Sequence, residues 1–225
     1  LGVATDGDAD RFGAVDRDRQ FWHPNQLLAL AFAHVTMSRF ECGSVARSAA
    51  TTHMLDALAR KRGFGVQETK VGFKWLGERL RTTDAVFVGE ESAGMTIKPH
   101  IGEKDGILAG LLLVEMVAWH AKSLAELWED LVNEVGEYYT RRIDMEVPAE
   151  RKEKIMERLR SEPPEVLGGV KVAGVDEPDG VRFTLEDGSW VVVRPSGTEP
   201  LLRAYVETHT RERLEALVGV VKGLV

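Results

Sequence analysis

Cysteine is nearly absent from the sequence, with Cys42 alone among 225 residues. A single cysteine excludes an intrachain disulfide, a cysteine-rich zinc site and the disulfide framework of a small secreted protein. Long apolar runs are also absent, because the longest, residues 107–119, is interrupted by Glu115. It falls short of the roughly 18 apolar residues that a membrane-spanning helix needs, so it predicts a buried helix. We therefore expect a cytoplasmic protein with no membrane segment.

Basic residues are in deficit. Lysine and arginine total 29 against 36 acidic residues, which leaves a net charge of -7. This balance excludes a basic nucleic-acid surface as the organising feature of the protein. Several enzyme motifs are missing as well, since the sequence contains no P-loop, no Gly-x-Gly-x-x-Gly and no His-Glu-x-x-His. NTPases, dinucleotide enzymes and zinc proteases are therefore disfavoured.

Apolar, β-branched segments alternate with helical patterns after Gly43, the βαβ rhythm of a parallel sheet covered by helices. The expected strands are residues 44–49, 65–69 and 84–88, and the expected helices are residues 52–62, 73–81 and a segment from about residue 105. Thr51 or Thr52 is the predicted N-cap of the first of these helices. Ser123 and Glu126 form a capping box ahead of a further amphipathic helix.

The pattern changes after Gly136, where we place a domain boundary. A polar, alternating stretch leads to Pro148, which opens a charged helix. Strand patterns then dominate, and an amphipathic helix closes the sequence, which indicates a small α+β domain. The expected strands are residues 170–175, 181–185, 190–194 and 201–207, and the closing helix carries Leu214, Leu217, Val218, Val221 and Leu224.

The first segment suited to chemistry has Asp6, Asp8 and Asp10 directly after a strand pattern. Carboxylate oxygens are the ligands that Mg²⁺ and Ca²⁺ prefer, and small residues between them let all three turn toward one point. An EF-hand is excluded, because Arg11 and Arg17 stand where that loop needs glycine and glutamate. The alternative is a solvated acidic turn, but three carboxylates this close repel one another unless a cation lies among them.

The second segment, residues 89–94, follows an apolar strand and includes Glu90, Glu91 and Ser92. Ligands of open α/β sheets bind beyond the carboxyl ends of strands, so this glycine-flanked loop suits a polyol. By itself it is equally typical of a plain surface turn. It is not a nucleophile elbow, because Glu90 stands where that motif requires glycine.

The third segment, residues 194–200, lies between two expected strands. Arg194, the hydroxyls of Ser196 and Thr198, and the flexible backbone at Gly197 can together surround a phosphate group. The alternative is a tight turn between strands, for which proline, serine and glycine need no ligand. The arginine and threonine favour phosphate binding.

Taken in order, these segments resemble those of the α-D-phosphohexomutases, a family that includes phosphoglucomutase and phosphomannomutase. The matching segments are residues 6–11, 69–75, 89–94, 102–106 and 194–200. The resemblance implies an α/β domain, with a mixed sheet covered by helices, followed by a smaller α+β C-terminal domain. It assigns residues 1–20 to the end of the family's second domain, residues 21–136 to the third and residues 137–225 to the fourth. The sequence also begins without methionine, so we expect a preceding N-terminal half.

The resemblance also implies a cofactor and a role for each matching residue. Mg²⁺ is the expected cofactor, held by Asp6, Asp8 and Asp10. The expected catalytic residues are Arg11 and Lys104, and the expected substrate-binding residues are Lys74, Glu90, Ser92, Arg194, Ser196, Gly197 and Thr198. In the family, a phosphoserine in a Ser-His-Asn motif exchanges phosphoryl groups with a hexose monophosphate through a hexose 1,6-bisphosphate. No Ser-His-Asn occurs in this sequence, so the phosphoserine is expected in the missing N-terminal half.

The expected partners are hexose phosphates, hexose 1,6-bisphosphate and that N-terminal half, with no nucleic acid and no membrane. Glu91 between Glu90 and Ser92 resembles the sugar loop of phosphoglucomutases, which favours glucose phosphates over mannose or glucosamine phosphates. This sequence without an N-terminal half is predicted to be inactive. Two alternatives stay open, namely a non-catalytic module that binds metal and phosphosugar, and one half of a split enzyme.

Overall fold

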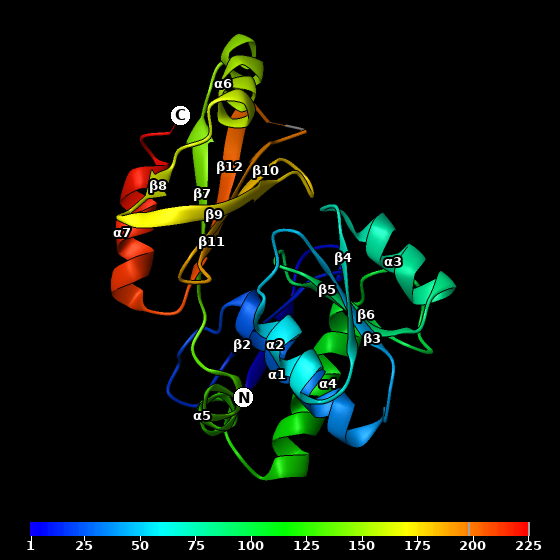
Figure 1. The fold of residues 1–225 in the computed structure, drawn as a ribbon. Coiled ribbons are helices and arrows are strands. Elements are labelled where there is room, and N and C mark those ends of the chain that lie inside the picture. The colour runs from blue at the N-terminus through cyan, green and yellow to red at the C-terminus, as the bar shows by residue number, and fades with distance from the viewer. Residues whose placement is uncertain (198, 225) are drawn as a thin grey trace. The chain divides into compact units, whose positions relative to one another are not determined.

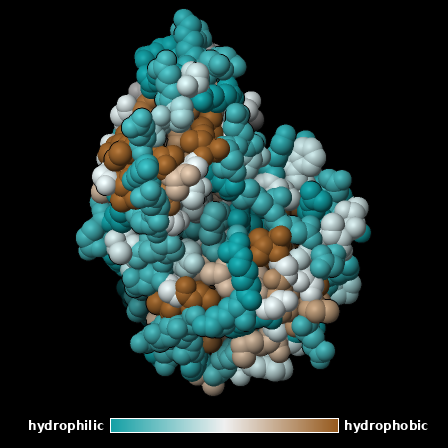
Figure 2. Space-filling model, viewed as in Figure 1, coloured by the Kyte–Doolittle hydropathy of each residue, from teal (hydrophilic) through white to brown (hydrophobic). Residues whose placement is uncertain are grey.

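The computed structural model describes residues 1–197 and 199–224. The chain forms two compact units, Leu1–Gly136 and Glu137–Val225 (Figure 1). Residues 1–20 are part of the first unit, and their assignment to a preceding domain stays a prediction. Figure 2 shows a mostly hydrophilic visible surface with small hydrophobic patches.

The first unit is built on a mixed sheet of four strands in the order β4-β3-β5-β6. β3 (Ser44–Ser48) pairs in parallel with β4 (Gly65–Thr69) and with β5 (Ala85–Glu90), as the βαβ rhythm predicts. β6 (Gly94–Ile97) adds an antiparallel edge that the alternation does not reveal. The predicted α/β class with a mixed sheet is confirmed. β3 and β5 are buried along their whole length, which explains their continuous apolar character.

Five helices of the first unit surround this sheet or extend from it. They are α1 (Pro24–Ser38), α2 (Met54–Lys61), α3 (Phe73–Thr82), α4 (Gly106–His120) and α5 (Leu124–Val135). The predicted capping box is present at α5, where the backbone N–H of Ser123 donates to Glu126 at 2.8 Å and the Ser123 side chain accepts from the Glu126 backbone. Gly136 follows with φ of 88° and ends the helix.

The prediction of a buried helix at residues 107–119 is only half right. α4 forms there and its inner face is buried, but Ile107, Leu111 and Val114 are exposed. Their spacing places them on one face of the helix. A helix that is apolar on every face gives no periodic signal to distinguish its solvent side from its core side. Within the described residues, no single helix has the length and hydropathy to cross a membrane, although α4 and α5 meet that test together, with a bend of 83°.

A hairpin precedes the sheet. β1 (Gly2–Thr5) and β2 (Phe12–Val15) pair antiparallel, and residues 6–11 form the loop between them. Phe12 and Ala14 of β2 are buried, whereas all four residues of β1 are exposed. The hairpin thus anchors the acidic loop to the first unit through β2.

The second unit is a six-stranded antiparallel sheet in the order β7-β12-β11-β10-β9-β8. Its elements are β7 (Tyr139–Glu146), α6 (Ala149–Ser161), β8 (Val166–Leu167), β9 (Val170–Asp176), β10 (Val181–Leu185), β11 (Trp190–Pro195), β12 (Leu201–Thr208) and α7 (Arg211–Val221). Both helices contribute to one apolar core, with Met156 and Leu159 from α6 and Leu217 from α7. The predicted smaller α+β domain is confirmed, and β7 and the two-residue β8 were not among the expected strands.

Candidate functional site

The acidic loop between β1 and β2 brings its carboxylates together. Asp6, Asp8 and Asp10 each offer an oxygen, and these atoms all lie within 4.8 Å of one another. The backbone N–H of Arg11 donates to Asp6 Oδ1 at 3.1 Å, and Ala9 adopts a left-handed conformation with φ of 58°. These two features turn the loop back on itself. The convergence of carboxylates makes the loop fit a hard divalent cation, while the metal role stays a prediction.

Lys104 lies beside this loop, with its ammonium nitrogen 2.7 Å from Asp10 Oδ2 and 3.4 Å from Glu103 Oε1. Burial disfavours its charge, but the hydrogen bond to Asp10 and the charges of both carboxylates outweigh burial and raise the pKa of Lys104 above its usual value. The side chain is therefore protonated at neutral pH. It suits charge stabilisation or proton donation better than proton abstraction.

Two glycines permit this close arrangement. A Cβ on Gly106 would lie 2.3 Å from the carbonyl oxygen of Arg11, and the backbone N–H of Gly106 donates to the carbonyl of Ala9 at 2.9 Å. A Cβ on Gly94 would lie 2.4 Å from Cδ of Lys104. Any larger residue at either position would push Lys104 or its loop away from the acidic loop.

Glu90, the last residue of β5, is almost fully buried, at 5% exposure. The hydroxyl of Ser92 donates to Glu90 Oε1 at 2.8 Å, and the left-handed Ala93, with φ of 71°, closes the turn. The backbone N–H of Phe12 donates to the carbonyl of Ala93 at 3.3 Å, which ties β2 to this turn. The structure therefore brings the acidic loop, Lys104 and the Glu90–Ser92 pair to one edge of the first unit.

Thr51 is a residue of this site that the sequence did not indicate. Its hydroxyl oxygen accepts from the backbone N–H of Glu91 at 3.1 Å and lies 2.8 Å from the hydroxyl of Ser48. The Ser48 hydroxyl in turn donates to Glu91 Oε2 at 3.4 Å. Both hydroxyl residues are fully buried. Thr51 therefore anchors the turn after β5. This role depends on the pairing of β3 with β5, so no local sequence pattern indicated it.

The predicted N-cap of α2 is corrected by the same geometry. The N-cap residue is His53, which makes no capping hydrogen bond through its side chain. Thr52 does serve the helix start, because its hydroxyl oxygen accepts from the backbone N–H of Met54 at 3.1 Å. Thr51 is directed to Glu91 instead, since β3 and β5 are neighbours in the sheet.

Lys74, in the first turn of α3, is exposed, and its ammonium lies 4.6 Å from the ring centroid of Trp75. Among the described residues, no hydrogen bond joins Lys74 to Glu90 or Ser92. The neighbouring Phe73 does contact the site, because the ammonium of Lys104 lies 5.4 Å from its ring centroid. The substrate-binding role of Lys74 stays a prediction.

The predicted phosphate loop connects β11 to β12 in the second unit. Arg194 directly follows the buried residues 190–193 of β11. Ser196 Oγ accepts from the backbone N–H of Glu199 at 3.2 Å. Lys152 of α6 donates to the carbonyls of Glu199 at 2.6 Å and Ser196 at 3.4 Å. The sequence did not indicate this lysine, which adds positive charge to the loop. Gly197 lies in the same turn, and Thr198 lies outside the described residues.

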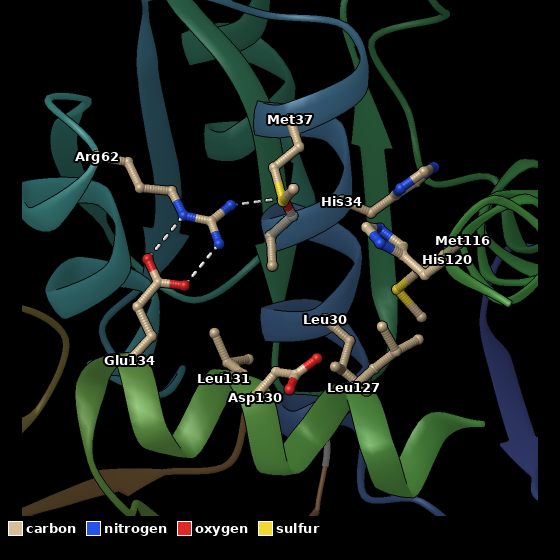
Figure 3. A pocket seen from close by; sticks show the side chains of 11 residues that line it. Leu30, His34, Met37, Arg62, Met116, His120, Leu127, Asp130, Leu131 and Glu134 are labelled. Atoms are coloured by element: carbon tan, nitrogen blue, oxygen red, sulfur yellow. Dashed lines mark hydrogen bonds and ion pairs between the residues drawn. The ribbon is translucent and has the colours of Figure 1, made fainter. Parts of the chain in front are cut away.

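A separate hollow of about 280 Å³ lies among α1, α4 and α5, and none of the predicted site residues lines it (Figure 3). On one side Arg62 pairs with Glu134 at 2.7 Å, and on the other lie His34 and His120. His34 is buried, and burial lowers its pKa. Because none of the predicted site residues lines this hollow, it is distinct from the candidate site.

Comparison with known proteins defines the family to which the chain belongs. The family model for phosphoglucomutase/phosphomannomutase α/β/α domain III matches residues 23–135, and the model for the C-terminal domain of the same family matches residues 143–222. The chain belongs to the phosphoglucomutase/phosphomannomutase family.

Individual relatives carry three different names. A probable phosphoglucosamine mutase of Pyrococcus furiosus is 34% identical over 100% of this chain and 48% of its own length. A phosphoglucomutase of Komagataeibacter xylinus is 32% identical over 92% of this chain and 40% of its own length. The crystal structure of a putative phosphomannomutase from Thermus thermophilus has a TM-score of 0.80 at 35% identity, covering 99% of this chain and 45% of that one. The chain thus spans about half the length of the relatives it matches.

Proposed function

We propose that this chain is the C-terminal half of a phosphohexomutase, which moves phosphate between C1 and C6 of a hexose. The observation that carries the proposal is the convergence of Asp6, Asp8 and Asp10 with Lys104 and the Glu90–Ser92 pair at one edge of the first unit. Membership of the family supports it, and so does the coverage of 48% of a probable phosphoglucosamine mutase. The N-terminal half would supply the phosphoserine that donates and accepts the phosphoryl group.

The acidic loop fits Mg²⁺, because three carboxylate oxygens within 4.8 Å of one another supply hard ligands of the kind this ion takes. When bound there, Mg²⁺ neutralises negative charge on a transferring phosphoryl group. Arg11 adds a guanidinium beside the loop, with Nε 3.7 Å from Asp10 Oδ1. The protonated Lys104 holds its charge against Asp10, which places a proton donor at the edge of the same loop.

Glu90 and Ser92 suit the sugar. A carboxylate oxygen accepts from ring hydroxyls, and the hydroxyl of Ser92 can both donate and accept. This pair can therefore form hydrogen bonds with the ring hydroxyls of a hexose in either of the two orientations that a C1-to-C6 transfer requires. Arg194, Ser196, Gly197 and Thr198 are proposed to hold the phosphate that is not reacting, with Lys74 as an additional contact to the substrate.

Three substrate classes are to be compared, namely glucose, glucosamine and mannose phosphates. Glu91 favours glucose phosphates by resemblance, and a phosphoglucomutase is among the relatives at 32% identity. Relatives named phosphoglucosamine mutase reach 36% identity, so names alone do not separate the two sugars. Mannose phosphates form the third arm of the comparison.

The test joins this chain to an N-terminal half that carries the Ser-His-Asn motif. Conversion of glucose 1-phosphate to glucose 6-phosphate is followed through a coupled dehydrogenase, with Mg²⁺ and glucose 1,6-bisphosphate supplied. The joined protein should turn over, and the 225-residue chain alone should not, because the phosphoryl carrier is absent. Binding of hexose phosphate by the joined protein without turnover of any hexose would support a non-catalytic module instead. Turnover by the chain alone would contradict the role of the N-terminal serine.

A further inference from the structure

The turn between β9 and β10 presses against the end of β11. Gly180 has φ of 101°, and a Cβ there would lie 2.3 Å from the carbonyl oxygen of Val193 and 2.7 Å from Cβ of Arg194. Only glycine allows such an approach in this backbone conformation. The pairing of Val181 with Val193 fixes the turn at this position. The residue before Gly180 therefore lies beside the start of the predicted phosphate loop.

That residue is Asp179, which pairs with the guanidinium proposed to bind phosphate. Asp179 Oδ2 lies 2.9 Å from Arg194 Nε, and the two side chains are only 23% and 17% exposed. Asp179 comes from the β9–β10 turn, whereas Arg194 comes from β11, so the pair depends on the order of strands in the sheet. Partial burial limits solvent screening, so the carboxylate acts on its neighbours more strongly than a surface charge would.

This pair has two opposite effects on a phosphate at the loop. The carboxylate orients the guanidinium, which lowers the conformational cost of binding an anion. Its negative charge also offsets the charge of Arg194 and repels an incoming phosphate dianion. In the proposed function, the bisphosphate turns over between two orientations, so its two phosphates occupy the loop in turn, and a loop that holds phosphate without holding it tightly favours this exchange. Tight uniform binding would slow that exchange.

We propose that Asp179 is a positioning residue of the phosphate loop that also acts as a counter-charge, so that it orients Arg194 and lowers the loop's affinity for phosphate. This inference rests on the proposed function, since it requires Arg194 to contact phosphate. It assigns a role to the β9–β10 turn, which contains none of the residues that the family resemblance indicates. The two effects of the carboxylate are separable, because an amide of the same shape retains an oxygen beside Arg194 Nε and loses the charge.

The test is a titration of the ¹⁵N-labelled chain with inorganic phosphate and with glucose 6-phosphate, monitored by NMR at low ionic strength. Asp179→Asn should bind phosphate roughly three- to tenfold more tightly than the unmodified chain, because a nearby negative charge is removed. The gain should shrink as salt is added. Asp179→Glu keeps the charge and should show no such gain. Asp187→Asn is the matched control, because Asp187 pairs with Arg213 at 2.8 Å in the turn between β10 and β11.

The outcomes distinguish the role of Asp179 from the proposed phosphate-binding role of Arg194. Arg194→Ala should weaken phosphate binding, and equal binding by this variant would remove Arg194 from the phosphate site, and with it the role of Asp179. If Arg194→Ala weakens binding but Asp179→Asn binds no more tightly than the unmodified chain, the counter-charge is wrong while the phosphate loop stands. Weaker binding by Asp179→Asn, with a spectrum otherwise unchanged, would leave only a structural role. No binding by any of these proteins would overturn both assignments.

Discussion

The two units build their candidate sites in different ways. In the first unit, the acidic loop, the turn after β5 and the segment before α4 are distant in sequence and meet at one edge of the unit. In the second unit, the phosphate loop is a single connection between β11 and β12, which are consecutive and paired. Mixed sheets with crossover helices gather loops from several strands at one edge, whereas an antiparallel hairpin makes a loop from neighbours. We therefore expect substitutions in the first unit to affect several of its loops together, whereas the phosphate loop depends on its own turn and on Asp179 and Lys152.

The largest expected effect tests the convergence of loops in the first unit. Asp8→Asn in the protein joined to an N-terminal half should lower kcat/KM at least about a hundredfold, because a metal ligand contributes several kcal/mol to stabilising the transferring group. The isolated chain should also bind Mg²⁺ more weakly, as measured by calorimetry. Asp18→Asn is the control, since Asp18 is exposed and accepts only a local backbone N–H at 3.0 Å. Equal Mg²⁺ affinity of Asp8→Asn and the unmodified chain would remove this loop as the metal site.

The second prediction concerns a buried ion-pair network that only the first unit contains among the described residues. Arg47 is 3% exposed and pairs with Asp56 at 2.6 Å and Glu68 at 2.8 Å, so it joins β3 to α2 and β4. Arg47→Met should lower the free energy of unfolding of this unit by about 3 kcal/mol, because it removes the close, buried cation of the Asp56 carboxylate, which is 6% exposed. Urea denaturation measures the loss, and hydrogen exchange should show the second unit unchanged.

Arg60→Met is the matched control for this prediction. Arg60 reaches the same Asp56 at 3.5 Å, but its side chain is 71% exposed. Exposed pairs contribute little, so the expected loss is below about 0.5 kcal/mol. Equal losses for the two variants, or a loss that extends to the second unit, would contradict the view that the units hold their structure separately.

The third prediction tests the anchor of the turn after β5, which is proposed to bind the sugar. Thr51→Val removes the acceptor for the backbone N–H of Glu91, which should speed exchange of that amide about fivefold, as expected for the loss of roughly 1 kcal/mol. In the joined protein, the discrimination between glucose and mannose phosphates should weaken. Thr51→Ser retains the hydroxyl and should restore both properties. Unchanged exchange at Glu91 in Thr51→Val would show that Thr51 does not hold the turn.

The smallest expected effect is a pH dependence in the first unit. The hydrogen bond and charge of Arg62 outweigh burial and hold the pKa of Glu134 below its usual value. A lowered pKa in the folded state stabilises the protein above the unfolded value, near 4.3, and this contribution disappears as pH falls through the folded value. Glu134→Gln should therefore cost up to about 1 kcal/mol at pH 7 and almost nothing at pH 3.

Thermal unfolding at both pH values measures this difference. Glu129→Gln on the same helix is the control, because Glu129 is exposed and its substitution should cost little stability at either pH. A constant cost for Glu134→Gln at pH 7 and pH 3 would mean that the Arg62–Glu134 pair contributes by packing alone.

Elements with a local signal were predictable. The strand at residues 65–69 has the bounds that its pattern predicts, and the capping box of Ser123 and Glu126 begins α5. α1 was not predicted, because Leu27, Leu28, Leu30 and their neighbours are buried on nearly every face and show no amphipathic period. Short strands such as β6 lack the length that alternation needs.

The sequence by itself determined the segments that carry chemistry, because spacing within a loop decides which side chains can converge. Asp6, Asp8 and Asp10 are such a case. Only the tertiary structure decided which distant side chains complete each segment. Lys104 meets Asp10, Thr51 holds Glu91, and Asp179 pairs with Arg194. These contacts depend on strand order and on glycines that let backbones approach closely, and both arise from packing of the whole unit, which no local pattern encodes.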